Sequence, residues 1–531
     1  MENAEKTTED KMFWADRIAS ELDAGKKQVV GDAKTPSGRI HVGSLRGVVI
    51  HDILFKAIKD AGKNVEFVYR FDDFDPMDGF PKGLDESFKR YMGMPLCDIP
   101  SPEKGAESFA RFYADEFIEV FEHLGCKPRV HWSSEYYRAG KMNDLIRTAL
   151  ERAVEIKEIN ERVSGTKKKG DWLPINVVCE KCGQIGGTVA SDFDGETVSY
   201  ECKDTKYSKG CGHKGRISPL NGRAKLTWKV DWAAIWKSLG VTVEGAGKDH
   251  YAAGGSHAVA TEISTKIFNY PTPYDVPYEH FLFGGKKMSS SKGLGVSLKE
   301  MDELLPPEIL RFIMTRYKPR TAIDFSPDGD TIIKLYSDYD SFAEASFGRR
   351  ESRDPDEKRI FELSQTTEDN RLTPKDYYRP NFGLLAYLIQ VPYIKVEEVM
   401  AKRKGCALSP MEKIELDKRI ASARLWLERY ADDEQKLVIV PHAEAVKAFA
   451  GFTAKQESVL HEFASFLEQH DAEEEQWNKI RELTATGGVS LKEFFELCYT
   501  LLVGRKKGPK LLPFINALEK SFVVGRLKGV H

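Results

Sequence analysis

The chain has 531 residues, with 79 Lys and Arg against 82 Asp and Glu and a formal net charge of −3. This length favours several domains, and the near-neutral charge argues against a protein that binds nucleic acid through net positive charge alone. The acid-rich start lacks an apolar signal segment and no apolar run is long enough to span a membrane, so we expect a cytoplasmic protein.

Strands and helices alternate in the first part of the chain. The pattern predicts, in order, a helix at 10–24, a strand running into a turn at 27–38, a helix at 45–62, a strand at 64–76, and helices at 109–125 and 138–163. Strand, helix and strand in succession form a βαβ unit. We therefore expect the α/β class, with a parallel sheet and right-handed crossovers.

The composition changes further along the chain. Residues 165–217 are rich in Gly, Lys and Cys and lack long periodic segments, which indicates an insertion. Beyond about residue 330 only amphipathic helical stretches remain, for example 411–431. We predict a Rossmann-like parallel-sheet domain at 1–330 that contains the insertion, followed by an all-α domain at 331–531.

The stretch "TPSGRIHVGSLRG" occupies positions 35–47, between the first strand and the next helix. The start of a helix offers unpaired N–H groups and a positive dipole end, which suit an anion. His41 can donate to a phosphate oxygen, and Gly43 allows close approach to the backbone. The alternative is an ordinary strand-to-helix turn with an incidental histidine, the commoner meaning of such a short pattern alone.

A second stretch, "KKMSSSKG", follows at 286–293. Lys286, Lys287 and Lys292 bracket three serines, and glycines flank the run. A mobile loop of this composition can close over a polyphosphate and neutralise the charge that develops as pyrophosphate leaves. The alternative is a solvated basic loop.

Together the two stretches resemble the signatures of the class I aminoacyl-tRNA synthetases. The HIGH type corresponds to His41-Val42-Gly43-Ser44, and the KMSKS type to Lys287-Met288-Ser289-Ser290-Ser291. Ser44 replaces a histidine and Ser290 a lysine, so Lys287 or Lys292 must carry the charge. We predict catalytic roles for His41, Gly43, Ser44, Lys287, Ser289, Ser290 and Lys292, and ATP contacts from Pro36, Ser37, His41, Gly43, Met288, Ser290 and Lys292.

Stretches such as "FVYRFDDFDPM" and "GKDHYAAGGSH", spread over 30–330, resemble the class I lysyl-tRNA synthetases. This resemblance implies activation of L-lysine with ATP and Mg²⁺, transfer to the 2′-hydroxyl at the end of tRNA(Lys), and anticodon recognition by the helical domain. It also implies an amino-acid pocket with contributions from Ala33, Thr35, Trp228, Asp249 and His250. We further expect a monomer that does not bind membranes.

A lysine site must bury an ammonium group, and therefore needs a carboxylate. The candidates in the sequence are Asp72, Asp73, Asp231 and Asp249, and we include Asp231 among the predicted lysine-binding residues. Trp228 and Trp232 could pack against the aliphatic stem. The structural alternative is that these residues are caps and core packing at strand ends.

Four cysteines, Cys179, Cys182, Cys202 and Cys211, lie within the insertion. Four thiolates are typical of a structural, tetrahedral zinc site, although His213 could replace Cys211. Unligated thiols are the alternative. The insertion is short for a separate editing domain, so we predict none.

Three other functions remain open. A class I synthetase for glutamate or arginine would share the motifs, although the only nearby arginines are Arg39 and Arg70. A nucleotidylyltransferase would share the fold, but rarely needs so long a helical part. A zinc-dependent RNA-binding protein would leave the lysine–serine stretch unexplained.

Overall fold

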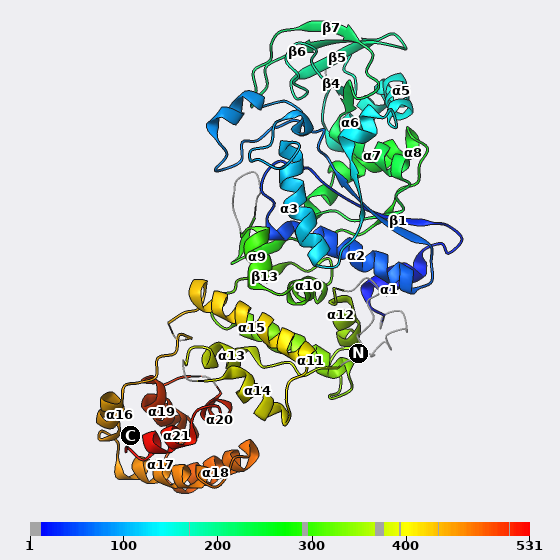
Figure 1. Cartoon of the computed structure of the whole chain (residues 1–531). Helices are drawn as coiled ribbons and strands as arrows, with labels where there is room; N and C mark the ends of the chain where they lie inside the picture. Colours follow the sequence, from blue (N-terminus) through cyan, green and yellow to red (C-terminus); the bar gives the residue numbers. More distant parts are fainter. Residues whose placement is uncertain are drawn as a thin grey trace. The chain divides into compact units, whose positions relative to one another are not determined.

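The computed structural model describes residues 12–168, 170–288, 296–366, 376–391, 394–433, 435–508 and 510–530. These residues form two compact units (Figure 1), the first from 1–302, 307–325 and 351–372, and the second from 303–306, 326–350 and 373–531. None of the helices in the described ranges combines the length and apolar character needed to cross a bilayer.

The first unit is built around a parallel sheet. Its strands run in the order β10-β9-β1-β2-β3, and every neighbouring pair is parallel. The order reverses between β1 and β9, and in such sheets ligands bind beyond the carboxyl ends of the strands at this reversal. The predicted α/β class is confirmed. The strand bounds are β1 (Gln28–Lys34), β2 (Val65–Phe71), β3 (Arg129–Trp132), β9 (Val243–Glu244) and β10 (Tyr274–Asp275).

Helices cover both faces of this sheet, because successive side chains of a strand point to opposite faces. On β2, Phe67 stacks near His51 of α2 and Tyr69 contacts Phe117 of α3, while Arg70 bonds to a carboxylate of α7 on the other face. Buried faces on both sides are expected for a parallel sheet. These helices are α2 (Leu45–Asp60), α3 (Phe109–His123) and α7 (Trp228–Leu239).

The predicted single helix at 138–163 is wrong, because the chain breaks it. Gly140 has φ 74° and ends the first helix, and a second interruption falls at Arg152. The resulting helices are α4 (Ser133–Arg138), α5 (Asn143–Glu151) and α6 (Ala153–Ser164). The remaining helices before residue 366 are α1 (Trp14–Glu21), α8 (Ser256–Lys266), α9 (Leu298–Leu304), α10 (Pro307–Thr315), α11 (Thr331–Ser346) and α12 (Glu357–Leu363).

The insertion and the segment after the sheet contain short strands. In the insertion, β5 (Thr188–Phe193), β6 (Val198–Cys202) and β7 (Lys214–Ile217) form an antiparallel sheet beside the pair β4 (Ile175–Val177) and β8 (Ala224–Leu226). Further on, β11 (Phe281–Phe283) pairs with β12 (Lys286–Lys287) and β13 (Ile323–Phe325).

Within its described residues, the second unit has helices as its only regular elements. Three of them begin with a capping box, in which Ser409, Thr453 and Ser490 each exchange bonds with the residue three positions on. The helices are α11 (Thr331–Ser346), α13 (Phe382–Leu388), α14 (Val396–Lys404), α15 (Pro410–Arg429), α16 (His442–Phe449), α17 (Ala454–Leu467), α18 (Glu473–Thr486), α19 (Leu491–Val503), α20 (Leu511–Ile515) and α21 (Lys520–Leu527).

Candidate active site

The first motif lies beyond the carboxyl end of β1. The chain turns after Lys34, forms the 3₁₀ turn η2 (Val42–Ser44) and continues into α2. The Ser44 N–H donates to the carbonyl of His41 at 3.0 Å, but the Ser44 hydroxyl makes no capping bond. The predicted turn and helix start are therefore present, and this hydroxyl remains available to a ligand.

His41 has an unused hydrogen-bonding atom at this turn. Its Nδ1 is buried, and no described residue bonds to it. Burial lowers the pKa of His41 to about 4, helped by the positive charges of Lys34 and Lys287. The imidazole is therefore neutral near pH 7, and can hydrogen-bond to a phosphate oxygen without being charged.

The second motif packs directly against the first. Met288 follows β12, is buried, and lies over Gly43, where an added Cβ would sit 2.9 Å from the Met288 methyl carbon. Eight positions beyond Met288, the carbonyl of Val296 accepts a hydrogen bond from the Val42 N–H at 3.3 Å. Two segments far apart in the chain therefore share one site.

Lys287 faces a carboxylate of η5 (Lys248–Tyr251). Its Nζ lies 2.6 Å from Asp249 Oδ2, and His280 Nε2 lies 3.4 Å from the other oxygen of this carboxylate. The bond from Lys287 lowers the pKa of Asp249. Because the Lys287 side chain is 57% exposed, it can leave Asp249 for a phosphate. The predicted residues Ser289, Ser290 and Lys292 lie outside the described residues.

These motifs and this sheet occur together in known proteins. Residues 12–367 match the family model of the class I tRNA synthetases (K). The chain belongs to this family. It is 34% identical over 523 residues to the lysine–tRNA ligase of Thermoplasma acidophilum, covering 98% of this chain and 99% of that protein. The lysine–tRNA ligase of Archaeoglobus fulgidus is also 34% identical, over 98% of this chain and 100% of that protein.

A solved glutamate tRNA ligase from Elizabethkingia meningosepticum aligns over 94% of this chain and 98% of its own. Its TM-score of 0.37 and identity of 12% are too low to support an inference. The resemblance to the class I lysyl-tRNA synthetases that the sequence predicts is confirmed by the family model and the relatives.

Two of the six predicted lysine-binding residues of this synthetase border one cavity of about 490 Å³. Thr35 and Trp228 line it, and the Thr35 hydroxyl donates to Asp75 Oδ2 at 2.8 Å. The His250 ring lies 5.6 Å from that of Trp228. Ala33 is exposed at the end of β1. The structure brings Thr35, Trp228 and His250 into one neighbourhood.

Asp231 lies elsewhere, fully buried in a network of charges. Its carboxylate is 2.8 Å from Arg70 and accepts a bond from the Tyr137 hydroxyl. Arg70 also bonds to Asp72 at 2.7 Å, and Lys225 reaches Asp72 at 3.2 Å. Asp231 and Asp72 therefore already have cationic partners. Nothing in the sequence around Lys225 indicates that its side chain neutralises these buried carboxylates.

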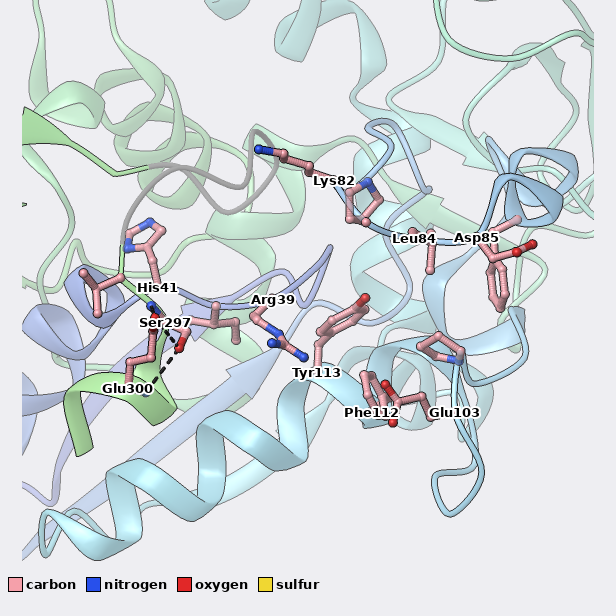
Figure 2. A pocket seen from close by; sticks show the side chains of 16 residues that line it. Arg39, His41, Lys82, Leu84, Asp85, Glu103, Phe112, Tyr113, Ser297 and Glu300 are labelled. Atoms are coloured by element: carbon pink, nitrogen blue, oxygen red, sulfur yellow. Dashed lines mark hydrogen bonds between the residues drawn. The ribbon is translucent and has the colours of Figure 1, made fainter. Parts of the chain in front are cut away.

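A second cavity, of about 530 Å³, opens beside His41. Figure 2 shows Arg39 and Tyr113 lying between His41 and a segment that carries Lys82 and Asp85. The lining offers two cations, Arg39 and Lys82, and aromatic rings next to the first motif, together with the carboxylates of Asp85, Glu103 and Glu300.

The four cysteines of the insertion converge. Their Sγ atoms all lie within 4.8 Å of one another, with Cys179 and Cys211 at 3.6 Å and Cys182 and Cys202 at 3.7 Å. Tetrahedral zinc with Zn–S bonds of about 2.3 Å requires sulfurs about 3.8 Å apart, so the cluster fits. His213 instead packs against Tyr200, with ring centroids 5.9 Å apart.

The cysteine cluster also holds one wall of the 490 Å³ cavity. Gly186 follows the first cysteine pair and Tyr207 lies between the second pair, and both line this cavity. The Gly186 N–H donates to the carbonyl of Gly93 at 3.0 Å, and the Tyr207 hydroxyl reaches the Gly186 carbonyl. A metal at the cluster would therefore hold both residues in place.

Proposed function

We propose that this chain is a lysine–tRNA ligase that activates L-lysine with ATP and transfers the lysyl group to the 3′ end of tRNA(Lys). The observation that carries the proposal is the packing of Met288 over Gly43, which joins the two motifs in one site. The names of the relatives support lysine as the amino acid.

In the activation step, a carboxylate oxygen of lysine attacks the α-phosphorus of MgATP. The bond to the β-phosphate breaks, and pyrophosphate leaves with the electron pair. His41 hydrogen-bonds to a phosphate oxygen, while Lys287 moves from Asp249 onto the charge that develops on the leaving group. No covalent enzyme intermediate is required, because positioning and charge stabilisation suffice.

In the transfer step, the 2′-hydroxyl of the terminal adenosine attacks the lysyl carbonyl carbon, and AMP leaves. The 530 Å³ cavity beside His41 suits the end of the tRNA, since Arg39 and Lys82 can face phosphates and Tyr113 can stack on a base. The helical second unit would bind the anticodon, whose unstacked bases can be read individually.

We assign the four thiolates to a structural zinc ion. With four protein ligands the ion would have no open position, so no reaction step passes through it. Its contribution would be to fold the insertion and fix Gly186 and Tyr207 at the cavity wall.

Replacing Cys182 with serine is therefore expected to remove zinc and to raise the KM for lysine, because the wall of the cavity loosens. Metal analysis of the purified protein should find one zinc ion per wild-type chain and almost none in the variant. Cys406→Ser is the matched control, since Cys406 is exposed and outside the cluster, and it should keep its zinc. A zinc-free wild-type protein with full activity would contradict the assignment.

The proposed function is tested by pyrophosphate–ATP exchange with the full chain, tRNA(Lys) and each of the twenty amino acids in turn. We expect exchange with lysine alone. Exchange with glutamate or arginine would mean that this amino acid, and not lysine, is the substrate. Exchange without any amino acid would favour a nucleotidylyltransferase. Absence of exchange under all conditions would refute a synthetase.

A further inference from the structure

Glu244 is a buried carboxylate at the carboxyl end of β9, beside the reversal of strand order. It is 9% exposed, and its Oε2 accepts bonds from the indole N–H groups of Trp232 and Trp236, at 2.7 Å each. These two tryptophans lie one turn apart on α7, so together they fix the orientation of the carboxylate. Both donors are neutral, and neither balances its charge.

The charge of Glu244 has no cationic partner within the described ranges. No Lys, Arg or His nitrogen there lies within ion-pair distance of it, and no group there donates to its second oxygen, Oε1. Oε1 is not among the fully buried side-chain atoms that lack a partner, and Glu244 as a whole is 9% exposed. A buried carboxylate without a cation is costly, so this site suits a cation from outside the chain.

His51 of α2 makes no bond to Glu244, and its own hydrogen bonds require a neutral ring, although the carboxylate of Asp32, 3.4 Å from Nδ1, raises the pKa of His51. Its Nε2 accepts the N–H of Gly245 at 2.7 Å, and its Nδ1 lies 2.7 Å from the carbonyl of Gly47. Only a neutral imidazole with a proton on Nδ1 satisfies both bonds. The titratable groups around Glu244 and its two indoles come from β1, α2, η5, α8, β10 and the segment after β10. They are Asp32, His51, His250, Tyr251, His257, Asp275 and Tyr278.

Glu244 is linked through Trp232 to residues that the family resemblance assigns to lysine binding. The Trp232 ring that donates to Glu244 is 5.7 Å from the ring of Trp228 and 5.5 Å from that of His250. Trp228 in turn lines the 490 Å³ cavity. A lysine side chain that enters past Trp228 would therefore have aromatic rings along its stem and a carboxylate at its end.

The four carboxylates that the sequence suggests for this task are less suitable. Asp72 and Asp231 are paired with Arg70, and Asp249 is more than half exposed and lies against both Lys287 and His280. Both oxygens of Asp73 accept bonds from Ser134, one from its N–H and one from its hydroxyl. Glu244 differs from all four, because one oxygen is held by neutral donors and the other is unused.

We infer that Glu244 is the specificity residue that receives the side-chain ammonium of the lysine substrate on Oε1, with the stem of the substrate along the outer face of the stacked Trp228 and Trp232 pair. This inference rests on the proposed function, because it concerns the same substrate. It also explains why two indoles converge on one oxygen: they orient the other oxygen for a ligand.

The inference predicts a dependence of lysine binding on pH. Burial raises the pKa of Glu244 to about 7, with a further contribution from Asp32. In the free enzyme below pH 7, the Glu244 carboxyl is therefore largely protonated. The ammonium binds the ionised carboxylate and lowers its pKa. Lysine binding should therefore release a proton near and below pH 7, and affinity for lysine should rise with pH until it levels off above pH 7.

The test compares wild-type protein with Glu244→Gln by calorimetric titration with lysine and with norleucine, which has the shape of lysine without the ammonium. We expect the variant to bind lysine roughly 100-fold more weakly, because one partner of a buried charge pair is removed. Norleucine binding and the KM for ATP should change little, and the dependence of lysine affinity on pH should disappear. Glu262→Gln, which changes a half-buried carboxylate of α8 that is paired with Arg162 and Lys266, is the matched control and should bind lysine as wild type does.

Two results would overturn the inference: unchanged lysine affinity in Glu244→Gln, or an equal loss for lysine and norleucine. If the variant does not fold, the wild-type protein still decides the question. Titration with lysine in two buffers of different ionisation enthalpy measures the protons released on binding, and no release at pH 6.5 would contradict the inference. A wild-type enzyme that activates another amino acid would refute the proposed function instead. A wild-type enzyme that activates lysine while Glu244→Gln is unaffected would refute only the role of Glu244.

Discussion

Replacing Lys287 with alanine is expected to slow formation of the lysyl-adenylate by roughly 10²–10³-fold, the loss typical of removing one preorganised group that stabilises developing charge. Lys287 reaches Asp249 and lies near His41, beside the first motif, rather than in the cavity lined by Thr35. The affinity for lysine should therefore change little. Single-turnover measurement of adenylate formation, with lysine affinity determined separately, checks both statements.

Lys286 provides the control within the same strand. It precedes Lys287 on β12, so its side chain points to the opposite face, and it is also exposed. Lys286→Ala should retain most of the activation rate. An equal loss in both variants would mean that general positive charge matters rather than the position of Lys287. A normal rate in Lys287→Ala would remove this residue from the proposed mechanism.

Replacing Asp231 with asparagine is expected to lower the free energy of unfolding of the first unit by about 3–5 kcal/mol, because it leaves the buried Arg70 without one of its two carboxylates. An amide can present only one acceptor oxygen, while Arg70 and Tyr137 both donate to the carboxylate. The tryptophans of α7 report on this region, so their fluorescence during urea unfolding measures the effect.

The matched control is Asp98→Asn, which removes a partly exposed partner of Arg138. Pairs of this kind contribute at most about 1 kcal/mol, so this variant should unfold close to wild type. If both variants lost the same stability, the buried network would be no more important to the fold than a surface pair. A stable Asp231→Asn protein with weakened lysine binding would instead support the role in lysine recognition predicted for Asp231.

Much of the secondary structure was predictable from local patterns. The helix predicted at 45–62 is α2 at Leu45–Asp60, and that predicted at 109–125 is α3 at Phe109–His123. Apolar residues at helical spacing make such segments readable without knowledge of their neighbours. The stretch at 138–163 has the same spacing throughout, and the breaks at Gly140 and Arg152 were missed because a local break in the backbone leaves the spacing of apolar residues unchanged.

The site was predictable only where the ligand requires a particular type of side chain. The stretches around His41 and Lys287 and the four cysteines stand out because phosphates and metals require particular side chains. Glu244 follows a short apolar strand and gives no comparable signal. Its importance depends on two indoles from α7 and on the lack of a cation in the described structure around it, and neither can be inferred from the residues beside it in the chain.

The sequence by itself determined the α/β class, the first βαβ unit of the sheet, the two phosphate-directed motifs and the composition of the cysteine cluster. These features depend on residue type and on spacing along a single element. The tertiary structure decided which charges are paired and which are available: Lys225 meets Asp75 from 150 positions away, and Lys287 meets Asp249 from 38. Such partners are set by the crossovers of the parallel sheet, which bring distant strand ends to one edge, and no local pattern records that proximity.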